Sequence, residues 1–206
     1  MSYFEPWTKY PCLTRERLSI VANIIREARH GAVLRFQPEY GENLWCLGCT
    51  NYSRTCSAIT TATHEYDWLR ILPEPKLLAF SFTIGTVSFR FYKGKPDDPP
   101  DRYLISTFGE LHHQQLCLEI DGLRPLDKIL RLAVETDDTL EVSDVTCVEL
   151  DEAGNPTGEY VIPLGAEPSN VTPIQPKPKD IPPPSLEPIK EEEDKEKKKA
   201  DGNPGS

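Results

Sequence analysis

The sequence predicts an α+β fold: a mostly antiparallel sheet of six or seven strands with about three helices on one face, followed by a disordered C-terminal tail. Two patterns indicate this fold. Apolar residues recur every three or four positions in some segments, as in amphipathic helices, and alternate with polar residues in several short ones, as in strands. The predicted order, helix–strand–strand repeated three times, differs from the strand–helix–strand alternation of a parallel nucleotide-binding sheet.

The first helix is predicted over residues 14–30. Thr14 is a suitable N-cap, Gly31 a suitable C-terminal stop, and one face is apolar at helical spacing, with Leu18, Val21, Ala22, Ile25 and Ala28. Two short segments, 32–37 and 44–47, then read as antiparallel strands around a turn that contains proline and glycine.

A second helix is predicted over residues 51–72, where a continuous apolar stripe ends at Pro73. The alternating segments "LLAFSFT" and "VSFRFY" flank Gly85 and predict a β-hairpin. Weaker periodicity over residues 103–120 predicts a third helix. Three strands follow over residues 129–135, 142–150 and 159–164, separated by polar turn sequences.

Composition divides the chain into a globular domain, residues 1–165, and a disordered tail, residues 166–206. The tail contains no aromatic residue and is rich in proline and charge. It carries nine acidic and seven basic residues of a chain whose net charge is −10, which leaves −8 for residues 1–165. Phosphate backbones repel an acidic domain, so this balance disfavours nucleic acid as a general partner.

The N-terminal residues show no signal-peptide pattern, and no apolar run is long enough to span a membrane. We therefore expect a cytoplasmic protein without a membrane partner, in which the six cysteines are reduced thiols. No glycine-rich phosphate loop is present, and we expect no cofactor.

The stretch "WCLGCTNYSRTC" places Cys46, Cys49 and Cys56 close together. Zinc requires four Cys or His ligands, and the sequence offers no matching second pair. A redox-active thiol near the start of the helix predicted at residue 51 is another interpretation, since a helix N-terminus lowers a thiol pKa. We favour a third, in which Cys46 and Cys49 bracket the end of a strand and Cys56 packs on the helix stripe.

The triplet Glu74-Pro75-Lys76 resembles in form the Glu-x-Lys end of a metal-dependent nuclease site, in which carboxylates hold the metal ion and lysine stabilises phosphate charge. Pro75 argues against it, because such motifs lie within core strands and proline lacks the backbone donor a core strand needs. A metal-dependent nuclease or hydrolase that uses Glu74 and Lys76 is therefore the enzymatic alternative.

Basic residues suggest a nucleic-acid surface formed by Arg15, Arg35, Arg90 and Lys93, provided that the fold brings them to one face. Acidic residues lie among them, and an ordinary mixed-charge surface explains them equally well. A nucleic-acid-binding module is therefore a further alternative.

The tail offers a partner motif. Pro173 and Pro176, followed by Lys177 and Lys179, have the form that aromatic-lined polyproline grooves bind, although a simple tether has the same composition. Because no catalytic constellation stands out, the leading hypothesis is a non-catalytic interaction or regulatory protein whose partner is another protein.

Overall fold

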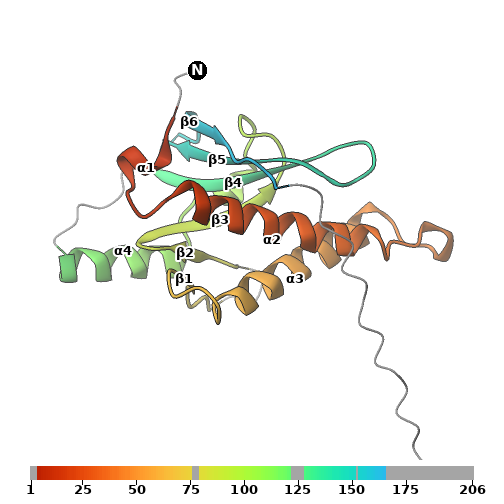
Figure 1. The fold of residues 1–206 in the computed structure, drawn as a ribbon, viewed down its shortest axis with the longest axis horizontal. Helices are drawn as coiled ribbons and strands as arrows, with labels where there is room; N and C mark the ends of the chain where they lie inside the picture. Colours follow the sequence, from red (N-terminus) through yellow and green to blue (C-terminus); the bar gives the residue numbers. More distant parts are fainter. Residues whose placement is uncertain (1–3, 76–78, 122–127, 152, 166–206) are drawn as a thin grey trace, which may run out of the picture. The chain divides into compact units, whose positions relative to one another are not determined.

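The computed structural model describes residues 4–75, 79–121, 128–151 and 153–165 (Figure 1). Its helices and strands follow one another along the chain as α1 (Pro6–Lys9), α2 (Arg15–Val33), η1 (Pro38–Tyr40), α3 (Leu44–Ala62), β1 (Leu69–Ile71), β2 (Phe82–Ile84), β3 (Val87–Lys93), η2 (Asp101–Tyr103), α4 (Phe108–Asp121), β4 (Ile129–Thr136), β5 (Val142–Leu150) and β6 (Pro156–Val161).

The six strands form one sheet in sequence order, β1-β2-β3-β4-β5-β6. Every neighbouring pair is antiparallel except β3 and β4, which run parallel and are connected through the segment that contains α4. A parallel pair needs such a long crossover, whereas the other pairs are joined by short connections. The predicted α+β fold with a mostly antiparallel sheet is confirmed.

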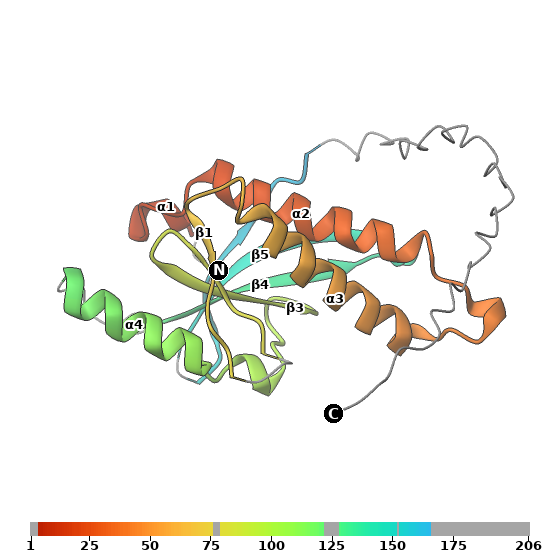
Figure 2. The ribbon, with the colours of Figure 1, turned by 90° about the horizontal axis from the view of Figure 1, so that it is seen from below.

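Helices α2 and α3 cover one face of the sheet and lie side by side (Figure 2). Their apolar stripes meet alternate residues of the strands, including Phe89 on β3 and Leu132 on β4, in the main hydrophobic core. Thr14 caps α2 as predicted, since its side chain accepts a hydrogen bond from the Arg17 amide. The burial of these stripes explains the stability of both helices better than helix propensity alone.

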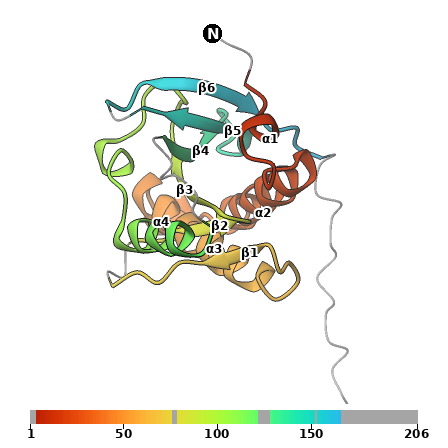
Figure 3. The ribbon, with the colours of Figure 1, turned by 90° about the vertical axis from the view of Figure 1, so that its left-hand side faces the viewer.

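The prediction placed all helices on one face, but the first turn of α4 contacts the other. Arg131 alternates with the core residues Leu130 and Leu132 and so points to the opposite face of β4. There its guanidinium forms a buried ion pair with Glu110 of α4, 2.6 Å between Nη1 and Oε1. Figure 3 shows α4 and α2 on opposite sides of β3.

The strands predicted over 32–37 and 44–47 do not form. Helix α2 continues through Gly31 to Val33, because Gly31 adopts no left-handed conformation and instead allows close approach of α3, whose Arg54 donates to the Gly31 carbonyl. Residues 44–47 are the first turns of α3. The Asn43 side chain caps that helix by accepting hydrogen bonds from the amides of Trp45 and Cys46, 3.0 Å each.

Other boundaries shift as well. The helix predicted over 51–72 ends at Ala62. The last part of the predicted helical segment instead contains strand β1 (Leu69–Ile71), which pairs with β2. The third helix begins at Phe108, and the last strand is Pro156–Val161. The expected order was helix–strand–strand, repeated three times. The observed order of the longer elements is instead two helices, three strands, one helix and three strands.

The predicted hairpin around Gly85 forms, with β2 and β3 paired antiparallel, but β2 comprises only Phe82–Ile84 and is shorter than the predicted segment LLAFSFT. Among the described helices, none combines the length and apolarity needed to cross a lipid bilayer. The predicted tail, residues 166–206, lies outside the described residues, so its predicted disorder and the boundary at residue 165 stay predictions.

Candidate functional site

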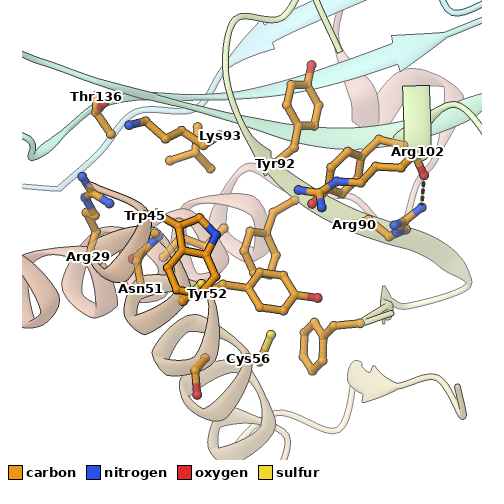
Figure 4. A pocket seen from close by; sticks show the side chains of 18 of the residues that line it. Arg29, Trp45, Asn51, Tyr52, Cys56, Arg90, Tyr92, Lys93, Arg102 and Thr136 are labelled. Atoms are coloured by element: carbon orange, nitrogen blue, oxygen red, sulfur yellow. Dashed lines mark hydrogen bonds between the residues drawn. The ribbon is translucent and has the colours of Figure 1, made fainter. Parts of the chain in front are cut away.

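The candidate site is a pocket at an open edge of the sheet. Strand β2 pairs with β3 only as far as Phe89, whereas β3 continues to Lys93 along β4. In the described part of the chain, residues 90–93 therefore have a strand on one side only. Helix α3 lies beside this edge, and between them is a cavity of about 870 Å³ (Figure 4).

Helix α3 contributes one continuous stripe to the pocket wall. The stripe consists of residues spaced three or four apart, which share one helix face: Trp45, Gly48, Cys49, Tyr52 and Cys56. The turn that carries Trp45 is the one capped by Asn43, so the cap fixes the start of this wall.

Strand β3 contributes side chains from both faces. Phe91 and Lys93 point to the face covered by α2 and α3, and Arg90 and Tyr92 point to the other face. All four line the cavity, because it lies at the edge of the sheet and reaches around it.

The charge of the lining is entirely positive. Four of its residues are cationic, and no aspartate or glutamate is among them: the cations are Arg29, Arg90, Lys93 and Arg102. In Figure 4, Arg29 and Lys93 lie on one side of the pocket, and Arg90 and Arg102 lie on the other. A local excess of four positive charges in a chain of net charge −10 is a feature that needs an explanation.

Arg29 lies on the buried face of α2 and is only 2% exposed. Its Nε donates to the Leu140 carbonyl at 2.7 Å, but its buried Nη2 has no hydrogen-bond partner. Burial lowers the pKa of this guanidinium, and the negative charge of Glu141 opposes that effect. The Arg29 guanidinium is therefore poorly solvated, and its Nη2 donor has no acceptor.

Lys93 stands near Arg29 at the end of β3. Partial desolvation lowers the pKa of its ammonium, and the positive charge of Arg29 lowers it further. An anion bound between or beside these two like charges would relieve their repulsion.

Arg90 is held by its neighbours at the other end. Its Nη1 donates to the carbonyls of Arg102, at 2.8 Å, and Ile105, at 3.3 Å, and its guanidinium stacks on the Tyr103 ring at 4.5 Å. The buried Nε of Arg90 has no partner. Arg102 also lies over the Tyr103 ring, at 4.9 Å, so one aromatic ring orients both cations.

The rest of the wall is aromatic and apolar. The rings of Tyr52 and Phe91 lie 5.5 Å apart, and Phe80 contacts Phe91 edge-on at 6.3 Å. Burial raises the pKa of the Tyr52 hydroxyl well above its ordinary value. Trp45, in contrast, is 75% exposed at the mouth of the pocket.

The four residues of the predicted nucleic-acid surface do not gather. Arg90 and Lys93 share the pocket, but Arg15 is the first residue of α2 and Arg35 follows its last, so the helix, about 28 Å long, separates them. Arg15 pairs with Glu5 at 3.5 Å and stacks on the Trp7 ring at 4.5 Å.

The three cysteines all lie on α3, and none of them marks the end of a strand. Cys49 is in the second turn of α3 and Cys46 in the first, because the helix begins at Leu44, and the redox interpretation stays a prediction. Cys56 packs against the main core, where burial raises the pKa of its thiol to about 11. Within the described residues, no three His, Cys, Asp or Glu side chains are arranged to hold a metal ion.

The Glu74 carboxylate takes part in hydrogen bonds that hold three chain segments together. Its Oε1 accepts hydrogen bonds from the hydroxyls of Ser81 and Thr107, which ties the segment after β1 to the segment before β2 and to the approach to α4. Lys76 lies outside the described residues, as do Pro173, Pro176, Lys177 and Lys179 of the tail. The nuclease and polyproline interpretations therefore stay predictions.

The candidate site residues chosen from the sequence do not include Arg29, Trp45, Asn51 or Arg102, although Arg29 and Arg102 belong to the two groups of basic residues from which they were chosen. The sequence did contain an indication for Arg29. It lies four residues after Ile25 on an otherwise apolar helix stripe, and charged residues are rarely buried unless they are paired or functional. Trp45 was assigned to a strand, which concealed its place on the same helix face as Tyr52.

Comparison of the chain with protein-family models, with curated proteins and with solved structures gives no significant match.

Proposed function

We propose that this chain is a non-catalytic binding protein and that its ligand carries an anionic group into the pocket between α3 and the open edge of β3. One observation carries the proposal: four cationic side chains line the cavity without a carboxylate among them, and two buried donors, Arg29 Nη2 and Arg90 Nε, have no acceptor.

The energetic argument concerns these two donors. A buried donor without a partner costs about 1–3 kcal/mol, and more when its group is charged. An anion that accepts from such a donor forms a charge-assisted hydrogen bond of about 1.5–3 kcal/mol and also relieves the repulsion between Arg29 and Lys93. Phosphate and carboxylate oxygens are the groups that guanidinium binds best.

The tyrosine hydroxyls and the Cys56 thiol of the wall favour binding over catalysis. Burial raises the pKa values of the Tyr52 and Tyr92 hydroxyls and of the Cys56 thiol, so these groups keep their protons at neutral pH. A protonated phenol or thiol is a poor base and a poor nucleophile. The expected interaction or regulatory role thereby gains a definite candidate site.

The test is calorimetric titration of the full chain with inorganic pyrophosphate at low ionic strength. We expect one binding event that weakens as salt is added, because the attraction is electrostatic. Lys93→Met and Arg29→Met should each weaken binding about tenfold or more, as expected from the loss of about 1.5 kcal/mol or more.

Arg70→Met is the matched control, because Arg70 is an exposed arginine on β1 outside the pocket. Thermal unfolding of each variant verifies that the fold is intact. Absence of pyrophosphate binding, or equal binding by all three variants, would overturn the proposal. Breakdown of the bound pyrophosphate would overturn its non-catalytic part.

A further inference from the structure

We infer that the ligand of this pocket is a nucleotide, whose base enters between Trp45 and Tyr52 and whose phosphate meets Arg29 and Lys93. The inference rests on the proposed function and adds the class of ligand to it. Three features of the pocket other than its charge lead to it: a slot on α3, an exposed tryptophan ring and an unpaired acceptor.

The slot is a consequence of helix geometry. Trp45 and Tyr52 are seven residues apart on α3, which places them on the same face about 10.5 Å apart along the axis. The residues between them on that face are small, Gly48 and Cys49. A Cβ built on Gly48 would meet no neighbouring atom within 4 Å, apart from its own helix backbone, so the space above it is open.

The spacing of the two positions along the helix axis suits a planar ring between their side chains. Aromatic rings in contact have centroids about 4.5–7 Å apart, so a ring between two others spans about 9–14 Å in total. The spacing of Trp45 and Tyr52 along α3 falls within that span.

The Trp45 ring is available for stacking. Trp7 packs edge-on against Tyr160 at 5.0 Å, and Trp68 packs against Tyr66 at 5.1 Å. Trp45 has no such ring contact and no stacked cation within the described part of the chain, and it is 75% exposed. Exposed aromatic rings beside cationic side chains are the usual means by which proteins hold unpaired nucleotides.

Asn51 distinguishes a nucleotide from a simple anion. It lines the pocket near Trp45 in Figure 4, and its buried Oδ1 has no hydrogen-bond donor. The ionised oxygens of an anion only accept hydrogen bonds, whereas the edges of nucleobases carry N–H groups that can donate to this oxygen. A ligand that satisfies Asn51 as well as Arg29 needs both an N–H donor and anionic oxygens.

A free nucleotide and an unpaired nucleotide of a single strand share this chemistry. The cavity of about 870 Å³ is within the range of small-molecule sites, and the charge of −8 on residues 1–165 repels a long phosphate backbone. Both arguments favour the free nucleotide.

The experiment titrates the full chain with ADP, GDP, CDP, UDP, inorganic pyrophosphate and a ten-nucleotide single-stranded DNA, followed by calorimetry and tryptophan fluorescence. We expect at least one nucleoside diphosphate to bind ten or more times more tightly than pyrophosphate and to quench tryptophan emission. Tighter binding of the DNA than of every diphosphate would identify a strand as the natural source of the nucleotide.

Three variants at two positions test the slot. Trp45→Ala should reduce nucleotide affinity about tenfold and pyrophosphate affinity much less, and Trp45→Phe should restore most of the loss. Gly48→Leu should fill the slot and have the same selective effect. Tyr40→Ala is the control, because Tyr40 is an equally exposed aromatic residue, 79% exposed, outside the pocket.

The two levels of inference fail in different ways. If pyrophosphate and all nucleotides bind equally, and Trp45→Ala changes neither, the ligand is not a nucleotide while the anion site stands. If neither pyrophosphate nor any nucleotide binds, the proposed function itself is wrong.

Discussion

Two buried arginines show how the same side chain serves different purposes in this molecule. Arg131 is 1% exposed and fully engaged: it pairs with Glu110 and donates to the carbonyls of Tyr103 and Leu130. Arg29 is 2% exposed and keeps one donor without an acceptor. Complete pairing indicates a structural role for Arg131, whereas the unpaired donor of Arg29 beside the cavity is consistent with the proposed binding role.

The Arg131–Glu110 pair yields a prediction on stability. Glu110→Ala leaves the Arg131 guanidinium buried without its carboxylate, and breaking a buried pair in this way costs about 3–5 kcal/mol. We expect the free energy of unfolding in urea to fall by that amount. The double variant Glu110→Leu, Arg131→Met should recover much of the loss, because it removes both charges together. A single variant as stable as the parent would show that the pair does not hold α4 to the sheet.

At the scale of elements, the start of α3 and the turn between β2 and β3 determine where the pocket lies. The Asn43 cap sets the first turn of α3 and with it the position of Trp45. The hairpin sets the length of the β2–β3 pairing and with it the open edge of β3. Gly85 is essential to that hairpin, because its φ is +63° and a Cβ there would stand 2.5 Å from the Cys12 Cβ.

Gly85→Ala therefore combines two costs. The left-handed conformation costs about 1–2 kcal/mol for a residue with a Cβ, and the contact with Cys12 adds to that by displacing the chain. Gly41→Ala is the matched control, because Gly41 has a φ of +89° but open space around it. We expect Gly85→Ala to lower the free energy of unfolding by at least about 1 kcal/mol more than Gly41→Ala does. Equal losses, measured by urea denaturation, would show that the approach of Cys12 has no energetic weight.

At the scale of the whole molecule, charge is distributed unevenly. A chain of net charge −10 concentrates four cationic side chains around one cavity. The surrounding negative charge hinders the approach of large polyanions, while the local cations attract a small one that can enter the pocket. The proposed preference for small anions would thus depend on the charge of the molecule as a whole.

The domain boundary is also a property of the whole chain. A chain that ends at Gly165 keeps the hydrogen bond from the Gly165 amide to the Asn23 side chain, and the removed residues include no aromatic side chain. We expect its free energy of unfolding to equal that of the full chain within about 0.5 kcal/mol, because surface changes away from packed features have effects of that size. Side-by-side urea denaturation of the two chains is the measurement. A loss of more than about 1 kcal/mol would place part of the tail in the folded unit.

The sequence by itself determined the fold class, the first helix with its Thr14 cap, the central hairpin and the strands β4 and β5, because these depend on local periodicity and turn chemistry. It misassigned residues 44–47, since a short apolar segment reads equally well as a strand or as a helix start, and only the Asn43 cap and the packing of α3 on α2 decide between them. The sequence by itself did not predict the pocket. Arg29, Trp45 and Arg90 come from three different elements, and only the end of the β2–β3 pairing brings them around one cavity. Tertiary structure decided the site, because residues far apart in the chain become neighbours only when the elements that carry them have packed.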